Sequence, residues 1–169
     1  MRRFVLGLAL AATILSADSG AGVRWTMPAS WKAEAQRAMR LATYSVAADT
    51  ECGVYYFGSG QGGSVQANLD RWIGQFLQAD GKPSKDAAKI DKRSVHALPV
   101  TSVDVSGAYT GMGGPTAPSG PAVPGYRMLG AVVEGPQGSV FFKFVGPAKG
   151  VSANQAAFDK MIASLEPVR

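Results

Sequence analysis

The glycine-rich segment 58–63 carries the clearest chemical motif in the chain. Its residues, GSGQGG, match the G-x-G-x-x-G pattern, follow a strand-like run and precede a helix-like one. In that context backbone N–H groups and a helix N-terminus can face a phosphate or another anion. Gly60, Gly62, Gly63 and Ser64 are therefore candidate ligand-binding or anion-binding residues.

Two other interpretations of this turn have to be weighed. A dinucleotide site needs a second parallel strand with an acidic residue near its end, whereas a lysine-rich polar stretch follows the helix here. A tight turn that simply requires glycine accounts for the same residues. The sequence favours the structural interpretation, keeps anion or polymer binding as the functional one, and predicts no cofactor.

His96 is the only histidine and the natural starting point for a catalytic group. With Asp104 and one of several serines it could serve a hydrolase, but no G-x-S-x-G nucleophile motif is present. A zinc site needs three or four ligands, which one histidine and the single cysteine, Cys52, do not supply. We therefore predict no catalytic residue and no metal, and keep a hydrolase using His96 and Asp104 as the alternative.

Residues 1–21 have the three parts of a secretory signal peptide. Two arginines precede an uncharged apolar run over residues 4–15, and small residues follow it. A membrane span takes about 20 apolar residues, so this run has the length of a signal peptide core instead. A retained membrane anchor and a twin-arginine signal are the alternatives.

Signal cleavage fits best after Ala21, which leaves residues 22–169 as a single α+β domain. Cleavage after Ala17 or Ser19 is also compatible with the small residues there. A lipoprotein signal needs a cysteine at the cut, and Cys52 lies far beyond it. We expect an exported protein, periplasmic or secreted, with no transmembrane segment after cleavage.

The charge balance is mildly basic. Seventeen lysines and arginines stand against twelve acidic residues, a formal net charge of +5 over 169 residues. That density is well below the basic patches of nucleic-acid-binding domains, so no nucleic-acid partner is expected. The lysine-rich segment 82–93 is either a solvated connector or a contact for anionic envelope polymers.

The pattern of apolar residues predicts a mostly antiparallel sheet of about six strands, covered by two amphipathic helices. The first helix begins at the N-cap Ser64 and ends at Asp80-Gly81; the second begins with the capping box 152–155 and ends before Pro167. Hairpin turns at 48–50 and 135–138 join neighbouring strands. The expected strands are 40–47, 51–57, two within 95–109 that are broken near Pro99, 126–134 and 139–145.

The order of strands and helices, together with two short sequence patches, resembles that of the PsbP-like fold. One is the N-terminal segment WTMPASW, with Trp25 and Trp31 on either side of Pro28; the other is the closing run Phe158-x-x-Met161-Ile162-x-Ser164-Leu165. That superfamily includes extrinsic photosystem subunits, a Ran-binding import factor and exported bacterial proteins of unknown role. The resemblance implies an α/β/α sandwich and a binding or scaffolding role more often than an enzyme.

The Gly/Pro-rich segment 110–125 reads as a long exposed loop, because its prolines and glycines exclude a regular element. Met112 and Val123 are apolar residues on this loop, and with Tyr126 they are candidates for partner capture. A tolerated insertion is the alternative. We expect a non-enzymatic binding or interaction domain in the cell envelope, with an unknown envelope protein or polymer as its partner.

Overall fold

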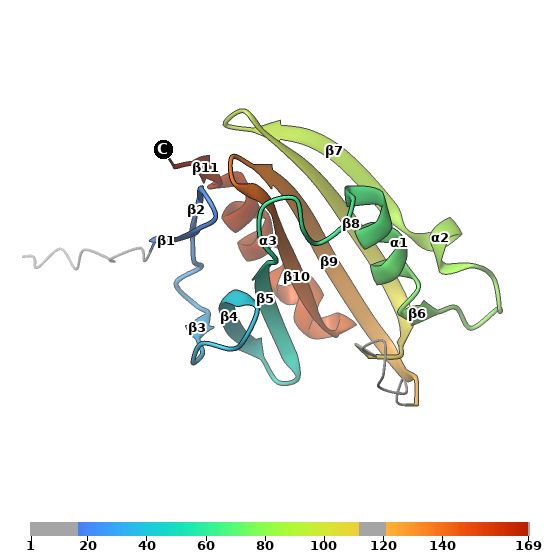
Figure 1. The fold of residues 1–169 in the computed structure, drawn as a ribbon. Coiled ribbons are helices and arrows are strands. Elements are labelled where there is room, and N and C mark those ends of the chain that lie inside the picture. The colour runs from blue at the N-terminus through green and yellow to red at the C-terminus, as the bar shows by residue number, and fades with distance from the viewer. Residues whose placement is uncertain (1–16, 112–120, 169) are drawn as a thin grey trace, which may run out of the picture.

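The computed structural model describes residues 17–111 and 121–168, and an eight-stranded antiparallel sheet forms its centre (Figure 1). The strand order is β3-β4-β5-β10-β9-β8-β6, and β7 also pairs with β8. The strands are β3 (Lys32–Ala33), β4 (Arg40–Ala47), β5 (Thr50–Tyr56), β6 (Phe76–Leu77), β7 (Lys89–Val95), β8 (Leu98–Tyr109), β9 (Val123–Gly135) and β10 (Gly138–Pro147).

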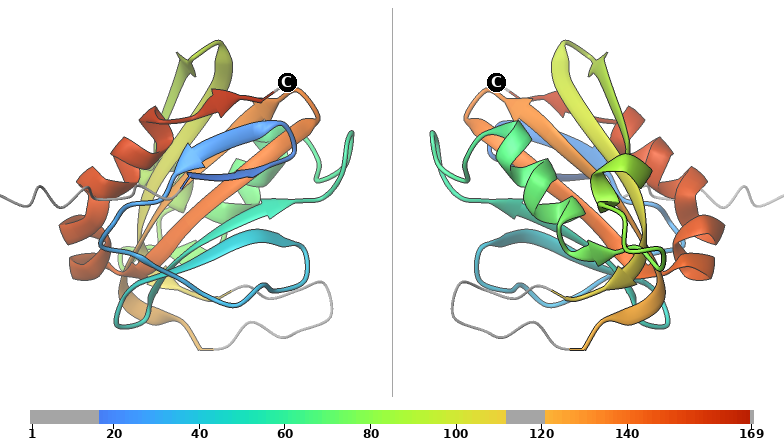
Figure 2. Two further views of the ribbon diagram at one scale, coloured as in Figure 1. Left: turned by 90° about the vertical axis from the view of Figure 1, so that its left-hand side faces the viewer. Right: turned by 90° about the vertical axis from the view of Figure 1, so that its right-hand side faces the viewer.

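Each face of the sheet is covered by a different layer (Figure 2). On one face lie the helix α3 (Ala148–Ala163) and a small sheet of β1 (Ala17–Gly20), β2 (Val23–Thr26) and β11 (Glu166–Pro167). On the other lie α1 (Val65–Ile73) and the short α2 (Ser84–Ala87). We call these the α3 face and the α1 face. Among the described residues, no helix combines the length and apolarity that a membrane span requires.

The central strand β10 shows how the sequence specifies two cores. Its side chains alternate between the faces, and both faces are buried, so the strand is a nearly continuous apolar run. Phe142 lies in the α3-face core, where its ring meets Trp25 edge-on at 5.3 Å. Phe141 lies in the α1-face core against Trp72 at 6.4 Å. Lys143, two residues after Phe141 and therefore on the same face, interrupts the apolar run on the α1 face.

The predicted antiparallel sheet with a helix on each face is confirmed, but its size was underestimated. The described residues hold three helices rather than two, and more strands than the six expected. The hairpins of β4 with β5 and of β9 with β10 form as predicted. The polar segment 82–93 is not only a connector, because it contains α2 and the first five residues of the edge strand β7.

Two helix boundaries were wrong. The first helix ends at Gly74 rather than near residue 80, since Phe76 leaves the helix to pair with Tyr109 in the sheet. The last helix begins at Ala148, four residues before the predicted capping box, and Ser152 lies inside it. Its hydroxyl instead accepts a hydrogen bond from Arg127.

The predicted break near Pro99 also lies elsewhere. The chain turns at His96 and Ala97, which both have positive φ, and β8 then runs without interruption. The predicted signal segment extends past the undescribed residues 1–16 into β1, whose residues 17–20 pair with β2. Cys52 is a free, fully buried thiol.

Candidate functional site

The α1 face is only partly covered, and its other half carries polar and aromatic side chains. The helix α1 packs over the apolar residues of β8, β9 and β10. Beyond it, toward β4 and β5, side chains that are half-buried replace the core. We call this region the open face and define it by Arg40, Glu51, Tyr55, Gln75, Tyr109, Tyr126 and Lys143, which come from β4, β5, β8, β9, β10 and the link after α1.

Lys143 forms the floor of the open face, and the residue is only 3 % exposed. Its Nζ donates to Gln75 Oε1 at 2.6 Å and to Tyr109 Oη at 3.2 Å. It also lies 5.4 Å from the centre of the Tyr109 ring. Within residues 17–111 and 121–168, no carboxylate forms an ion pair with it. Lys143 is therefore a buried amine without a counter-ion, an arrangement that costs free energy when the amine is charged.

This environment changes the protonation of the amine. Burial, together with the nearby cations Arg71 and Arg40, lowers the pKa of Lys143 from 10.5 to about 7, although Glu51 opposes this shift. Burial also raises the pKa of Tyr109 to about 12, so that hydroxyl keeps its proton. Near neutral pH the Lys143 side chain is therefore present partly as the charged ammonium and partly as the neutral amine.

Glycines occupy both positions beside Lys143 in the sheet. Gly53 on β5 and Gly130 on β9 are its cross-strand partners. A Cβ on Gly53 would lie 2.7 Å from the Tyr55 ring, and one on Gly130 would lie 2.7 Å from the Trp72 ring. The two aromatic rings thus lean over the backbone on either side of the lysine, which is why side chains are excluded there.

Aromatic rings and cations surround this floor. Tyr109 and Tyr126 stack with their ring centres 5.6 Å apart. The Arg40 guanidinium lies over the Tyr55 ring at 4.9 Å, and it also donates to Glu51 at 2.9 Å. Arg37 reaches the same carboxylate, so two arginines share Glu51.

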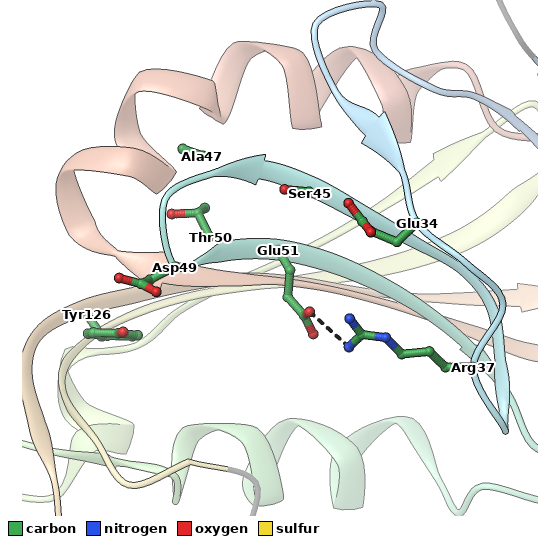
Figure 3. Close-up of a pocket in the computed structure, with 8 residues that line it drawn as sticks. All are labelled: Glu34, Arg37, Ser45, Ala47, Asp49, Thr50, Glu51 and Tyr126. Carbon is green, nitrogen blue, oxygen red and sulfur yellow. Dashed lines mark hydrogen bonds and ion pairs between the residues drawn. The ribbon is translucent and has the colours of Figure 1, made fainter.

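A pocket of about 420 Å³ continues the open face toward the β4–β5 turn (Figure 3). Glu51 and Tyr126 belong both to the open face and to the lining of the pocket, so the pocket adjoins the floor around Lys143. Figure 3 shows the Glu51 carboxylate turned toward Arg37, with Tyr126 at the opposite end of the pocket. The lining residues are Glu34, Arg37, Ser45, Ala47, Asp49, Thr50, Glu51 and Tyr126.

The glycine turn 58–63 has a structural explanation. Gly62 has φ +90°, and a Cβ there would lie within about 3 Å of two phenylalanine rings. Gly60 and Gly63 also have positive φ, and the Ser64 hydroxyl caps α1 by accepting from the Ala67 N–H. Among the described residues, no lysine or arginine donates a hydrogen bond to Gly60, Gly62, Gly63 or Ser64, and anion binding there stays a prediction.

The structure does not bring His96 and Asp104 together. His96 lies in the β7–β8 turn, where its Nδ1 is 2.8 Å from the Leu165 carbonyl oxygen. Asp104 lies further along β8, where it accepts two hydrogen bonds from Arg127. The intervening strand separates the two residues by about 20 Å, because each residue of a strand advances about 3.3 Å. The described residues also hold no cluster of three or more His, Cys, Asp or Glu that could bind a metal.

The structure describes two of the three residues predicted to capture a partner. Val123 is 47 % exposed at the start of β9, and its contact with a partner stays a prediction. Tyr126 is instead half-buried, stacks on Tyr109 and lines the pocket. Met112 lies outside the described residues.

Sequence reasoning missed Lys143, although a signal for it was present. The run VFFKFV is apolar on both faces of its strand, so a single lysine inside it must lie in a core. Such a lysine is a stronger pointer to a functional site than the glycine motif, because burying an amine opposes stability.

Comparison with protein-family models and with curated sequences gives no match. The solution structure of cyanobacterial PsbP (CyanoP) from Synechocystis sp. PCC 6803 is similar, with a TM-score of 0.55 and 13 % identity. The alignment covers 96 % of this chain and 98 % of that one. The chain has a PsbP-like fold. The crystal structure of PA94, a Pseudomonas aeruginosa protein of unknown function, aligns with a TM-score of 0.46 and 8 % identity over 92 % of this chain and 98 % of that one.

Proposed function

We propose that this protein is an exported, non-enzymatic binding domain of the cell envelope, and that its ligand lies on the open face. The observation that carries the proposal is Lys143, a buried amine without a counter-ion beside a pocket. A ligand that supplies an acceptor for this amine would offset the cost of burying it. The signal-peptide-like pattern of residues 1–21 supports the location.

Several features favour binding over bond-making chemistry. The sequence alternative, a hydrolase based on His96 and Asp104, has less support, because Asp104 accepts two hydrogen bonds from Arg127 while His96 lies in the β7–β8 turn. On the open face, the stacked pair Tyr109 and Tyr126 offers ring surface, and the arginines offer charge. Flat aromatic surface with a few oriented polar groups is typical of ligand sites.

The fold supports the same conclusion in a general way. Among the described residues, no helix packs over the part of the sheet that forms the open face, and the segment 110–125 leaves from β8 and returns to β9 beside it. Thr110 is fixed to the site, because its N–H donates to the Gln75 carbonyl at 2.9 Å while the Gln75 side chain accepts from Lys143. A partner bound at the loop would therefore also contact the open face.

The test is a thermal-unfolding screen of the purified domain against a panel of small anions, sugars and peptides. Ligands of the open face should raise the melting temperature of the wild type but not of Lys143→Met or Tyr126→Ala. Lys92→Met on the edge strand β7 and Tyr56→Phe on the α3 face are matched controls that should respond like the wild type. Stabilisation that survives in both open-face variants would contradict the proposal.

The exported location is tested separately. The full chain should be recovered from the periplasm or the medium with its signal removed, and mass spectrometry of the product gives the cut. An uncut protein found only in the cytoplasm would overturn this part of the proposal.

A further inference from the structure

The open face and its pocket differ in charge from one end to the other. At the end nearest α1, Lys143 lies among Arg71 and Arg40, whose charges both act on it. At the other end, the pocket carries the carboxylates of Glu34 and Asp49 with the hydroxyl of Ser45, and the Arg37–Glu51 ion pair also lines it. The site therefore offers donors for an anion at one end and hydrogen-bond acceptors at the other.

At the cationic end, the Lys143 ammonium has more N–H donors than it has acceptors in the described structure. A charged lysine has three N–H donors, and in the described structure Gln75 and Tyr109 accept two of them. The carboxylate of Glu51, which Arg40 contacts at this end, is shared with Arg37 of the pocket, so it does not balance the charges of Lys143, Arg40 and Arg71. An acidic group is the ligand chemistry that this end lacks.

The acceptor end has the composition of a site for hydroxyl groups. Carboxylates accept hydrogen bonds from hydroxyls strongly because the acceptor is charged. Asp49 lies in the β4–β5 turn, is exposed, and makes no ion pair within the described ranges. The Tyr126 ring borders the same pocket and presents a flat apolar surface to it.

We propose that the open face binds an acidic saccharide, whose carboxylate lies beside Lys143 and whose hydroxyl-bearing ring lies on Tyr126 in the pocket. This inference rests on the proposed function and names the ligand class of the same site. A carboxylate beside the buried ammonium supplies the missing counter-ion, and the hydroxyls find acceptors at Glu34 and Asp49.

The dimensions of the site agree with a short saccharide. Lys143 pairs with Gly53, and Glu51 at the pocket lies two residues further along β5. Two residues of a strand span about 7 Å. The Tyr109 ring bridges the interval, since it contacts Lys143 on one side and stacks on Tyr126. One or two sugar rings are enough to reach from the ammonium to the pocket.

The same chemistry is found in a free uronic acid and in a uronate-containing envelope polymer. Titrations with monomeric galacturonate and with a galacturonate tetramer distinguish these sources, because a polymer site gains affinity from the additional rings. The neutral maltotetraose and a cationic glucosamine tetramer are the matched controls. Binding is followed by amide shifts in ¹H–¹⁵N spectra, with Gly53, Gly130 and Tyr126 as reporters.

The expected result is saturable binding of the galacturonate tetramer, with shifts confined to the open face. Lys143→Met should weaken it about tenfold or more, because a charge-assisted hydrogen bond is lost. Arg71→Gln, an exposed position that leaves the buried core intact, should weaken it less, and Lys92→Met should not change it. Spectra of each variant establish that it is folded before the titration.

Three other outcomes overturn the proposal and separate it from the proposed function. Equal binding of the neutral and acidic tetramers would exclude a role for the carboxylate. Binding of a different anion or of the cationic tetramer on the open face, without uronate binding, would refute the saccharide and leave the binding site. Absence of any open-face shift with every probe would refute both.

Discussion

The most direct consequence of the buried amine is a dependence of stability on pH, which Lys143→Met should remove. Methionine has a similar length and stays neutral, so it fills the same space in the core. In the unfolded chain the lysine keeps its proton up to its ordinary pKa of 10.5, whereas in the folded protein it loses it around a pKa of about 7. The unfolded state thus binds more protons between these values, and the free energy of unfolding must rise with pH in that window.

The size of the effect follows from the same two values. Each pH unit in which only the unfolded state is protonated adds about 1.4 kcal/mol to the free energy of unfolding. From pH 7 to pH 9 the wild type should therefore gain about 2 kcal/mol from this residue, because the folded amine is still half protonated at the start of the window. Below pH 6 both states carry the proton, and the contribution of Lys143 becomes constant.

The assay is urea unfolding at half-unit steps from pH 6 to pH 9, for the wild type, Lys143→Met and the exposed control Lys92→Met. The difference between wild type and Lys143→Met should change by about 2 kcal/mol between pH 7 and 9, whereas wild type and Lys92→Met should run parallel. If the curves of wild type and Lys143→Met are parallel over this range, the amine does not titrate there. The account of the open face as a site with an unpaired buried charge would then be wrong.

Two further predictions concern packing at the N-terminus and beside the lysine. A chain that begins at Gly22 should be about 2 kcal/mol less stable in urea than one that begins at Asp18, because the Tyr44 hydroxyl donates to the Asp18 carboxylate and β1 pairs with β2; equal stability would show that β1 contributes nothing. Gly130→Ala should cost about 2 kcal/mol, since its Cβ would lie 2.7 Å from the Trp72 ring, and an unchanged unfolding midpoint would mean that the indole moves aside freely.

The sequence alone determined the local part of this structure. The alternation of apolar residues in β4, β5, β9 and β10, with turn residues between them, specified two hairpins. The two helices were expected because their apolar residues recur on one side. Such patterns are readable because the period of a strand or helix is a property of neighbouring residues.

Boundaries and pairings required the tertiary structure. The apolar pattern of the first helix would allow it to continue past Gly74. The helix ends there because Phe76 instead pairs with Tyr109 in the sheet and packs against its ring, with the two ring centres 5.1 Å apart. The strand β7 has an exposed, lysine-rich sequence, and it forms because the neighbouring strand β8 offers an edge. Interactions between distant residues decide these cases, and a local pattern does not contain them.

The candidate site is also a feature that required the tertiary structure. A lysine inside an apolar run is visible in the sequence, but the residues that surround it come from β4, β5, β8, β9, α1 and the link after α1. Only the folded sheet shows that two tyrosines, a glutamine and two arginines surround Lys143 without a carboxylate partner among the described residues. The sequence determined that an amine is buried; the tertiary structure decided what surrounds it, because desolvation and charge depend on distances across strands.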